Sequence, residues 1–142
     1  MVCAELPPLA STCSTVLIID DNEQDLKYWS ETVRNFGSNY TVLKAHDWKS
    51  GLSICRDRTV DCVLLDLDMP ESGFKALLDL IPNRKRPAIA VIIFTRLVHP
   101  FLAEITKYNG AQDWLVKQHT SADELEAAID RAVVAVKSAR GN

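Results

Sequence analysis

Residues 61–70, DCVLLDLDMP, contain four apolar residues in succession followed by two acids, Asp66 and Asp68. A short run that is apolar throughout, rather than alternating with polar residues, is typical of a strand covered on both faces, as in a parallel sheet. The change to Asp66 then places a carboxylate near the end of that strand. The segment therefore predicts a buried parallel strand that brings acids to one edge of a sheet.

Four further apolar runs have the same character, and helix signals lie between the runs. Asn22 and Asp47 are candidate helix N-caps, Gly37 is a stop signal, and Ser121 with Glu124 has the spacing of a capping box. Strands are expected at residues 15–19, 40–45, 62–67, 88–94 and 114–116. Helices are expected at residues 23–36, 48–56, 73–81, 100–108 and 122–138.

Five strands alternating with five helices define the α/β class, with a five-stranded parallel sheet, right-handed crossovers and helices on both faces. A chain of 142 residues suits one such domain. Residues 15–142 are assigned to it. Residues 1–14 are expected to be a flexible leader, because they hold no basic residue and Pro7 and Pro8 interrupt their apolar character.

Composition narrows the classes of function. The net charge of −3, with acids and bases interspersed, argues against direct nucleic acid binding. The four cysteines lack CxxC spacing and the three histidines are scattered, which argues against a zinc cluster. No run of about 20 apolar residues is present, so no membrane association is expected. Without a signal peptide or a disulfide pattern, a cytoplasmic location is the expectation.

Polar residues follow four of the expected strands. They are Asp20 and Asp21 after the first, Asp66 at the end of the third with Asp68 just beyond it, Thr95 after the fourth and Lys117 after the fifth. In open parallel sheets, ligands bind beyond the carboxyl ends of the strands, where the strand order reverses. Carboxylates gathered there repel one another, and a hard divalent cation relieves that repulsion.

Taken singly, each group has an ordinary explanation. Asp20 and Asp21 could stabilise the following helix by interacting with the positive end of its dipole, and Lys117 could be a solvated side chain. The joint occurrence at strand ends favours phosphoryl transfer to a carboxylate. Asp66 would attack phosphorus, while Mg²⁺ (or Mn²⁺) is held by Asp21 and Asp66, with Asp20 acting through water. The Thr95 hydroxyl and the Lys117 ammonium would each hold a phosphoryl oxygen.

The segments VLIIDDNEQDL, DCVLLDLDMP, VIIFT and GAQDWLVK resemble the signature segments of bacterial response regulator receiver domains. The resemblance covers about residues 15–138, and Met69 and Pro70 follow Asp66 as they do in that family. It implies a chemotaxis-regulator-like, flavodoxin-like (βα)5 fold with strand order 2-1-3-4-5. That order is taken from the resemblance and not from the residues.

The resemblance also implies a role for each site residue. Asp66 would be the phosphoacceptor of a phosphorelay, and Asp20 and Asp21 the acidic metal pair. Asp68 would offer its backbone carbonyl to the metal. Thr95 would be the switch hydroxyl, Lys117 the family's phosphoryl-binding lysine and Trp114 the switch aromatic. An aromatic on a short strand is equally explained as a core residue.

A receiver of this kind is a regulatory domain rather than an enzyme, although it promotes its own phosphorylation and dephosphorylation. A histidine kinase or a phosphotransfer protein would supply the phosphoryl group, and the effector is unknown. Phosphorylation would re-form the surface of the fourth helix, fifth strand and fifth helix, which could also support a dimer.

Several positions depart from the family pattern. Gln118 replaces a proline that is often cis, so the peptide bond there need not be cis. Arg96 stands where a small residue is usual, and its side chain could crowd the phosphoryl site or extend toward it. Trp48 replaces a usual glycine, and the PESG loop, residues 70–73, is one residue shorter than the common form.

Two alternatives remain open at this point. One is a pseudo-receiver, a binding module of the same fold without phosphorylation, which Arg96 and Gln118 favour. The other is a phosphatase of the haloacid dehalogenase type, because residues 66–68 form a DxD motif. Motif order argues against the phosphatase, since those enzymes place DxD first and their acidic pair last, whereas Asp20 and Asp21 precede Asp66 here.

Overall fold

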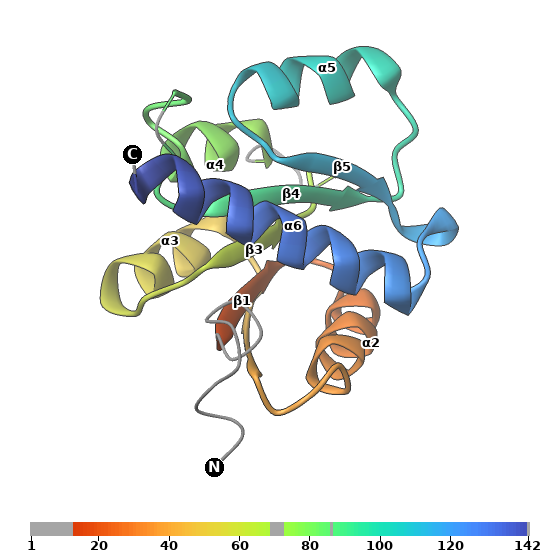
Figure 1. The fold of residues 1–142 in the computed structure, drawn as a ribbon. Coiled ribbons are helices and arrows are strands. Elements are labelled where there is room, and N and C mark those ends of the chain that lie inside the picture. Colours follow the sequence, from red (N-terminus) through yellow and green to blue (C-terminus); the bar gives the residue numbers. More distant parts are fainter. Residues whose placement is uncertain (1–12, 69–72, 86, 142) are drawn as a thin grey trace.

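The computed structural model describes residues 13–68, 73–85 and 87–141, and strands alternate with helices along them (Figure 1). The strands are β1 (Ser14–Ile19), β2 (Tyr40–Ala45), β3 (Cys62–Leu65), β4 (Ala90–Thr95) and β5 (Asp113–Val116). The helices are α2 (Glu23–Arg34), α3 (Trp48–Asp57), α4 (Gly73–Leu80), α5 (Pro100–Tyr108), the 3₁₀ turn η2 (Lys117–His119) and α6 (Ala122–Gly141).

The strands form one parallel sheet in the order β2-β1-β3-β4-β5. The expected flavodoxin-like order 2-1-3-4-5 is therefore confirmed. The order reverses at β1, which lies between β2 and β3. In the β1–β3 pairing Ile19 stands opposite Leu65. The residues that follow them, Asp20 and Asp66, therefore leave the sheet side by side at its carboxyl edge.

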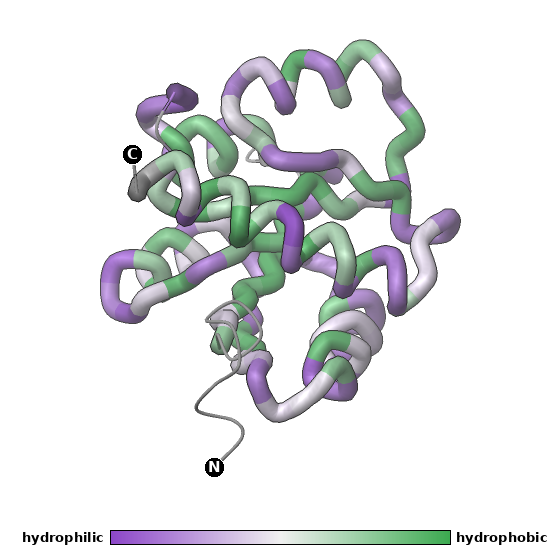
Figure 2. Tube along the Cα trace, in the orientation of Figure 1, coloured by the Kyte–Doolittle hydropathy of each residue, from purple (hydrophilic) through white to green (hydrophobic). Residues whose placement is uncertain are grey.

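Successive strand residues point to opposite faces of the sheet and supply two separate cores. One core joins β1, β3 and β4 to α2 and α6 through residues such as Trp29, Phe94 and Ile129. The other joins the same strands to α3 and α4 through residues such as Ile19 and Leu77. Figure 2 shows the hydrophobic residues concentrated along the central strands that both cores share.

Element ends differ slightly from those expected. The third strand stops at Leu65 rather than at residue 67, because the Asp68 N–H donates a hydrogen bond to Asp66 Oδ1 (2.9 Å) and turns the chain. The first helix stops at Arg34 rather than at residue 36; the Asn35 N–H donates to the Glu31 carbonyl, and the Phe36 N–H then donates to the Val33 carbonyl in a tighter turn.

The strand that was expected to begin at residue 15 begins at Ser14, inside the expected leader, and residues 1–12 lie outside the described part of the chain. The fourth strand begins at Ala90 rather than at residue 88, and the last helix continues to Gly141. Met69, Pro70 and most of the PESG loop also lie outside the described residues.

Two further features bear on the expectations. Among the residues that the structure describes there is no cis peptide bond. Gln118, at the position where the family usually has proline, lies within the 3₁₀ turn η2. In the same residues, no helix combines the length and the apolarity that crossing a membrane requires.

Candidate functional site

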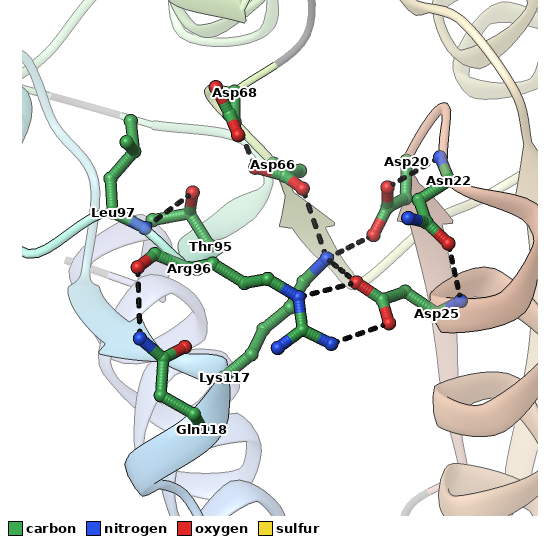
Figure 3. A network of polar contacts seen from close by, with 10 residues as sticks. All are labelled: Asp20, Asn22, Asp25, Asp66, Asp68, Thr95, Arg96, Leu97, Lys117 and Gln118. Carbon is green, nitrogen blue, oxygen red and sulfur yellow. Dashed lines mark hydrogen bonds and ion pairs between the residues drawn. The ribbon is translucent and has the colours of Figure 1, made fainter.

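The polar residues at the carboxyl edge of the sheet converge on one lysine (Figure 3). The Lys117 Nζ donates hydrogen bonds to Asp20 Oδ2, to Asp66 Oδ2 at 3.0 Å and to Asp25 Oδ2 at 3.0 Å. The Lys117 side chain is only 2% exposed. The structure thus brings together Asp20, Asp66 and Lys117, which stand at the ends of three different strands.

Local turns orient the two strand-end acids. Asp20 Oδ1 accepts from the Asn22 N–H (2.9 Å), and Asp66 Oδ1 accepts from the Asp68 N–H (2.9 Å). Each carboxylate therefore uses one oxygen to cap its own turn and keeps the other for Lys117. Asn22 also caps α2, because its Oδ1 accepts from the Asp25 N–H (3.0 Å).

Negative charge exceeds positive charge in the site, since two cations, Lys117 and Arg96, face the three carboxylates of Asp20, Asp25 and Asp66. Burial raises the pKa of Asp20 by more than the hydrogen bond from Lys117 lowers it. Burial lowers the pKa of Lys117, but its hydrogen bond to Asp20 and its interactions with Asp66 and Asp25 outweigh burial and raise the pKa overall. The surrounding carboxylates therefore favour the protonated form of Lys117.

Asp25, in the first turn of α2, is a site residue that sequence reasoning missed. The hydrogen bond from Arg96 has the largest effect on the pKa of Asp25 and lowers it. The hydrogen bond from Lys117 lowers this pKa further, and burial opposes both. An acid in a first turn is normally explained by the helix dipole. The available signal was its place five residues after Asp20, on the turn that faces the strand ends.

Arg96 extends across the site to α2. Its Nε donates to Asp25 Oδ2 (3.2 Å) and its Nη2 donates to Asp25 Oδ1 (2.8 Å), a bidentate ion pair. The sequence left open whether the Arg96 side chain crowds the phosphoryl site or extends toward it, and in the structure it extends toward the site.

Thr95 is fully buried at the end of β4, and its hydroxyl is engaged within its own loop. The Leu97 N–H donates to Thr95 Oγ1 (3.3 Å), and the Trp114 indole Nε1 donates to the Leu97 carbonyl (3.3 Å). Gln118 Nε2 donates to the Arg96 carbonyl (3.1 Å). Thr95 and Trp114, both predicted switch residues, are thus connected through the backbone of Leu97.

The remaining expected metal ligands, Asp21 and Asp68, lie exposed beside Asp20 and Asp66. Within the described ranges, no group of three or more His, Cys, Asp or Glu side chains is arranged to hold a metal ion. Lys117 bridges two of the expected ligands instead. The donor set nevertheless fits Mg²⁺, because its atoms are hard carboxylate oxygens and they carry excess negative charge.

A comparison with known families assigns the chain to one of them. A family model described as the response regulator receiver domain matches residues 16–130. The chain belongs to the response regulator receiver family. Membership decides against the haloacid dehalogenase alternative, and it places the chain in a regulatory family that serves two-component signalling.

Relatives of this receiver include both small and large proteins. PilH of Pseudomonas aeruginosa is 32% identical over 103 residues, which are 72% of this chain and 84% of PilH. A probable cyclic di-GMP phosphodiesterase of Vibrio cholerae is 30% identical over 72% of this chain, but the match spans only 23% of that protein. The receiver thus matches most of one relative and a minor part of the other.

Solved structures share the fold. A response regulator receiver domain protein from Clostridium thermocellum has a TM-score of 0.74 and 28% sequence identity, over 87% of this chain and 97% of that one. The receiver domain of a LuxO repressor protein from Vibrio parahaemolyticus has a TM-score of 0.76 at 22% identity, over 88% and 93% of the two chains, and shows the fold alone.

Proposed function

We propose that this receiver accepts a phosphoryl group on Asp66 in a Mg²⁺-dependent reaction, from a histidine kinase or a phosphotransfer protein. The observation that supports the proposal is the pairing of Asp66 Oδ2 with Lys117 Nζ at 3.0 Å, beside Asp20, where the strand order reverses. A carboxylate nucleophile, a buried cation and a second acid are the parts that transfer to a carboxylate requires.

Asp66 is the nucleophile. One of its oxygens forms the new bond to phosphorus, the bond between phosphorus and the donor group breaks, and the leaving group takes the electron pair. Asp20, Asp21, Asp66 and the Asp68 backbone carbonyl would hold Mg²⁺ or Mn²⁺. The bound metal would offset the negative charge on the phosphoryl oxygens.

Lys117 and Thr95 bind the product. The ammonium, which bridges acids in this structure, turns from a carboxylate to a phosphoryl oxygen, as a point charge on a flexible stem can. The Thr95 hydroxyl accepts a bond from the Leu97 N–H and keeps its own proton available for donation to the phosphoryl group. Movement of Thr95 would then alter Leu97 and, through its carbonyl, Trp114 on the surface of α5, β5 and α6.

The wider role follows from the same proposal. The receiver acts in the cytoplasm, where kinases of this type deliver phosphoryl groups, and it binds no nucleic acid directly. Its output is a change in the α5, β5 and α6 surface, which is available to a downstream protein, an effector domain or a second copy of the chain.

The acceptor is tested by labelling with acetyl phosphate and Mg²⁺, detected by intact mass. Asp66→Asn, which keeps the side-chain size, is expected to abolish labelling while the far-UV circular dichroism stays unchanged. Asp79→Asn is the matched control, because Asp79 is an exposed acid on α4, and it should be labelled as the wild type is. Labelling of Asp66→Asn would show that the acceptor is another residue.

Binding of Mg²⁺ is tested by stability. Mg²⁺ at a hundredfold excess over its dissociation constant is expected to stabilise the fold by about 2.7 kcal/mol. Urea unfolding with and without Mg²⁺ measures this, and the gain should disappear in the double variant Asp20→Asn, Asp66→Asn. If the wild-type protein neither gains stability from Mg²⁺ nor is labelled by acetyl phosphate, it is a pseudo-receiver.

A further inference from the structure

The ion pair between Arg96 and Asp25 places a second cation beside the proposed phosphoryl site. Figure 3 shows Arg96 crossing from the end of β4 to Asp25 on α2, next to the Lys117 ammonium. The Arg96 side chain is 55% exposed, whereas that of Asp25 is 12% exposed and that of Lys117 is 2% exposed. The guanidinium therefore lies at the solvent boundary, with open space beside it, while its carboxylate partner is largely buried.

Asp25 serves both cations at once. Its Oδ2 accepts from Arg96 Nε at 3.2 Å and from Lys117 Nζ at 3.0 Å. The same Lys117 Nζ lies 3.0 Å from Asp66 Oδ2, so a chain of short polar contacts joins Arg96 to the proposed acceptor. Because one carboxylate carries a single negative charge, Asp25 competes with any anion that arrives at Asp66 for both cations.

We propose that Arg96 is a second phosphoryl-binding cation, which Asp25 retains until a phosphoryl group is present on Asp66. The inference rests on the proposed function. Phosphorylation replaces the single charge of Asp66 with a more highly charged group that has several acceptor oxygens. A guanidinium matches such a group with two parallel hydrogen bonds. Arg96 directly follows Thr95 in the chain, so its backbone already lies beside the proposed phosphoryl-binding hydroxyl.

The proposal predicts effects of opposite sign for the two partners of one ion pair. Arg96→Ala removes a ligand of the phosphoryl group and should weaken its binding. Asp25→Asn removes the competing charge at nearly constant size and should strengthen it, because Arg96 and Lys117 are both released. An ion pair that only joined β4 to α2 would give the same sign in both variants, since either change breaks it.

The probe is beryllofluoride, which imitates a phosphoryl group on a carboxylate, titrated at constant Mg²⁺ and followed by fluorine NMR. Arg96→Ala is expected to raise the apparent dissociation constant about tenfold, the effect of losing one charge-assisted contact. Asp25→Asn should lower it severalfold, and Arg96→Lys should fall between wild type and Arg96→Ala. Arg34→Ala, an exposed arginine at the end of α2, is the control and should bind as the wild type does.

Two results would overturn the inference: equal weakening in Asp25→Asn and Arg96→Ala, or no change in either. A second measurement separates it from the proposed function. In Asp66→Asn, which cannot be phosphorylated at that position, inorganic phosphate is titrated while the Arg96 Nε–H resonance is followed. Movement of that resonance supports recruitment of Arg96 by an anion even if wild type binds no beryllofluoride, and a resonance that does not move refutes it.

Discussion

Helices α5 and α6 both border β5, yet they are attached to the domain in different ways (Figure 1). In α6, one face of apolar side chains is buried, including Leu125 and Ile129, which are fully inaccessible. In α5 the buried residue is Thr106, while Phe101 and Tyr108 are 65% and 67% exposed. One side of β5 is therefore fixed by apolar packing, and the other side can move at little cost in buried area.

Polar contacts replace apolar packing on the α5 side. The loop before α5 is tied by Arg96 to Asp25 and by the Leu97 carbonyl to Trp114. At the other end of the helix, Tyr108 accepts a hydrogen bond from Arg84 (3.0 Å). Such contacts are directional and individually weak, so they can be exchanged for others when the charge at the site changes.

The largest expected effect tests the apolar side. Ile129→Ala should destabilise the domain by about 3 kcal/mol, because it empties space in the core that α6 shares with β3 and β4. Phe101→Ala on α5 removes a larger but exposed side chain and should change stability by less than about 0.5 kcal/mol. Urea unfolding of both variants measures the contrast, and similar losses would show that the two helices are anchored alike.

An intermediate effect tests the polar attachment of the loop. Trp114→Phe removes the indole donor to the Leu97 carbonyl and should cost about 1 kcal/mol. Hydrogen exchange should accelerate at the amides of residues 97 and 98, and the amides in the middle of α6 should keep their protection. Unchanged exchange in the loop would mean that the indole contact does not restrain it.

The smallest effect is confined to acid pH. The hydrogen bond from Arg96 contributes most to lowering the pKa of Asp25 below its ordinary value of 3.8. The stability that Asp25 contributes is therefore complete above that value, and it is lost as the pH falls through the lowered pKa of the folded state. The difference in unfolding free energy between wild type and Asp25→Asn should accordingly shrink below pH 3.8.

Asp20 is present in both of these proteins, so its raised pKa, which acts with the opposite sign, largely cancels from that comparison. The difference between wild type and Ile129→Ala serves as the control and should not depend on pH. A difference for Asp25→Asn that stays constant down to the acid transition would contradict the ionic attachment of the α5 side.

The succession of strands and helices along the chain was predictable because it depends on local apolar runs and helix caps. Asn22 and Asp47 cap α2 and α3 as expected, and Ser121 with Glu124 forms the expected capping box. Strand ends were less predictable. β3 ends where the Asp66 side chain competes for the Asp68 N–H, and such competition between side chain and backbone leaves little trace in hydrophobicity.

Part of the candidate site was equally accessible from sequence. Asp20, Asp66 and Lys117 directly follow strands, and parallel strands bring their ends together. The pairing of Asp25 with Arg96 was not predictable from the sequence. The two residues are 71 positions apart, one in a helix and the other in a loop, and their contact depends on how α2 packs against the sheet. An acid in the first turn of a helix is ordinary, and Arg96 departs from the family pattern only in its size, which does not indicate its partner.

The alignment of Ile19 with Leu65 sets a rule for building hybrids of this domain with its relatives. Adding or deleting one residue within β1 or β3 would turn the following acid to the opposite face of the sheet, away from its partner. A functional chimera must therefore exchange these strands whole and at constant length. The turn at residues 37–39, far from the carboxyl edge, is the safer place for a junction.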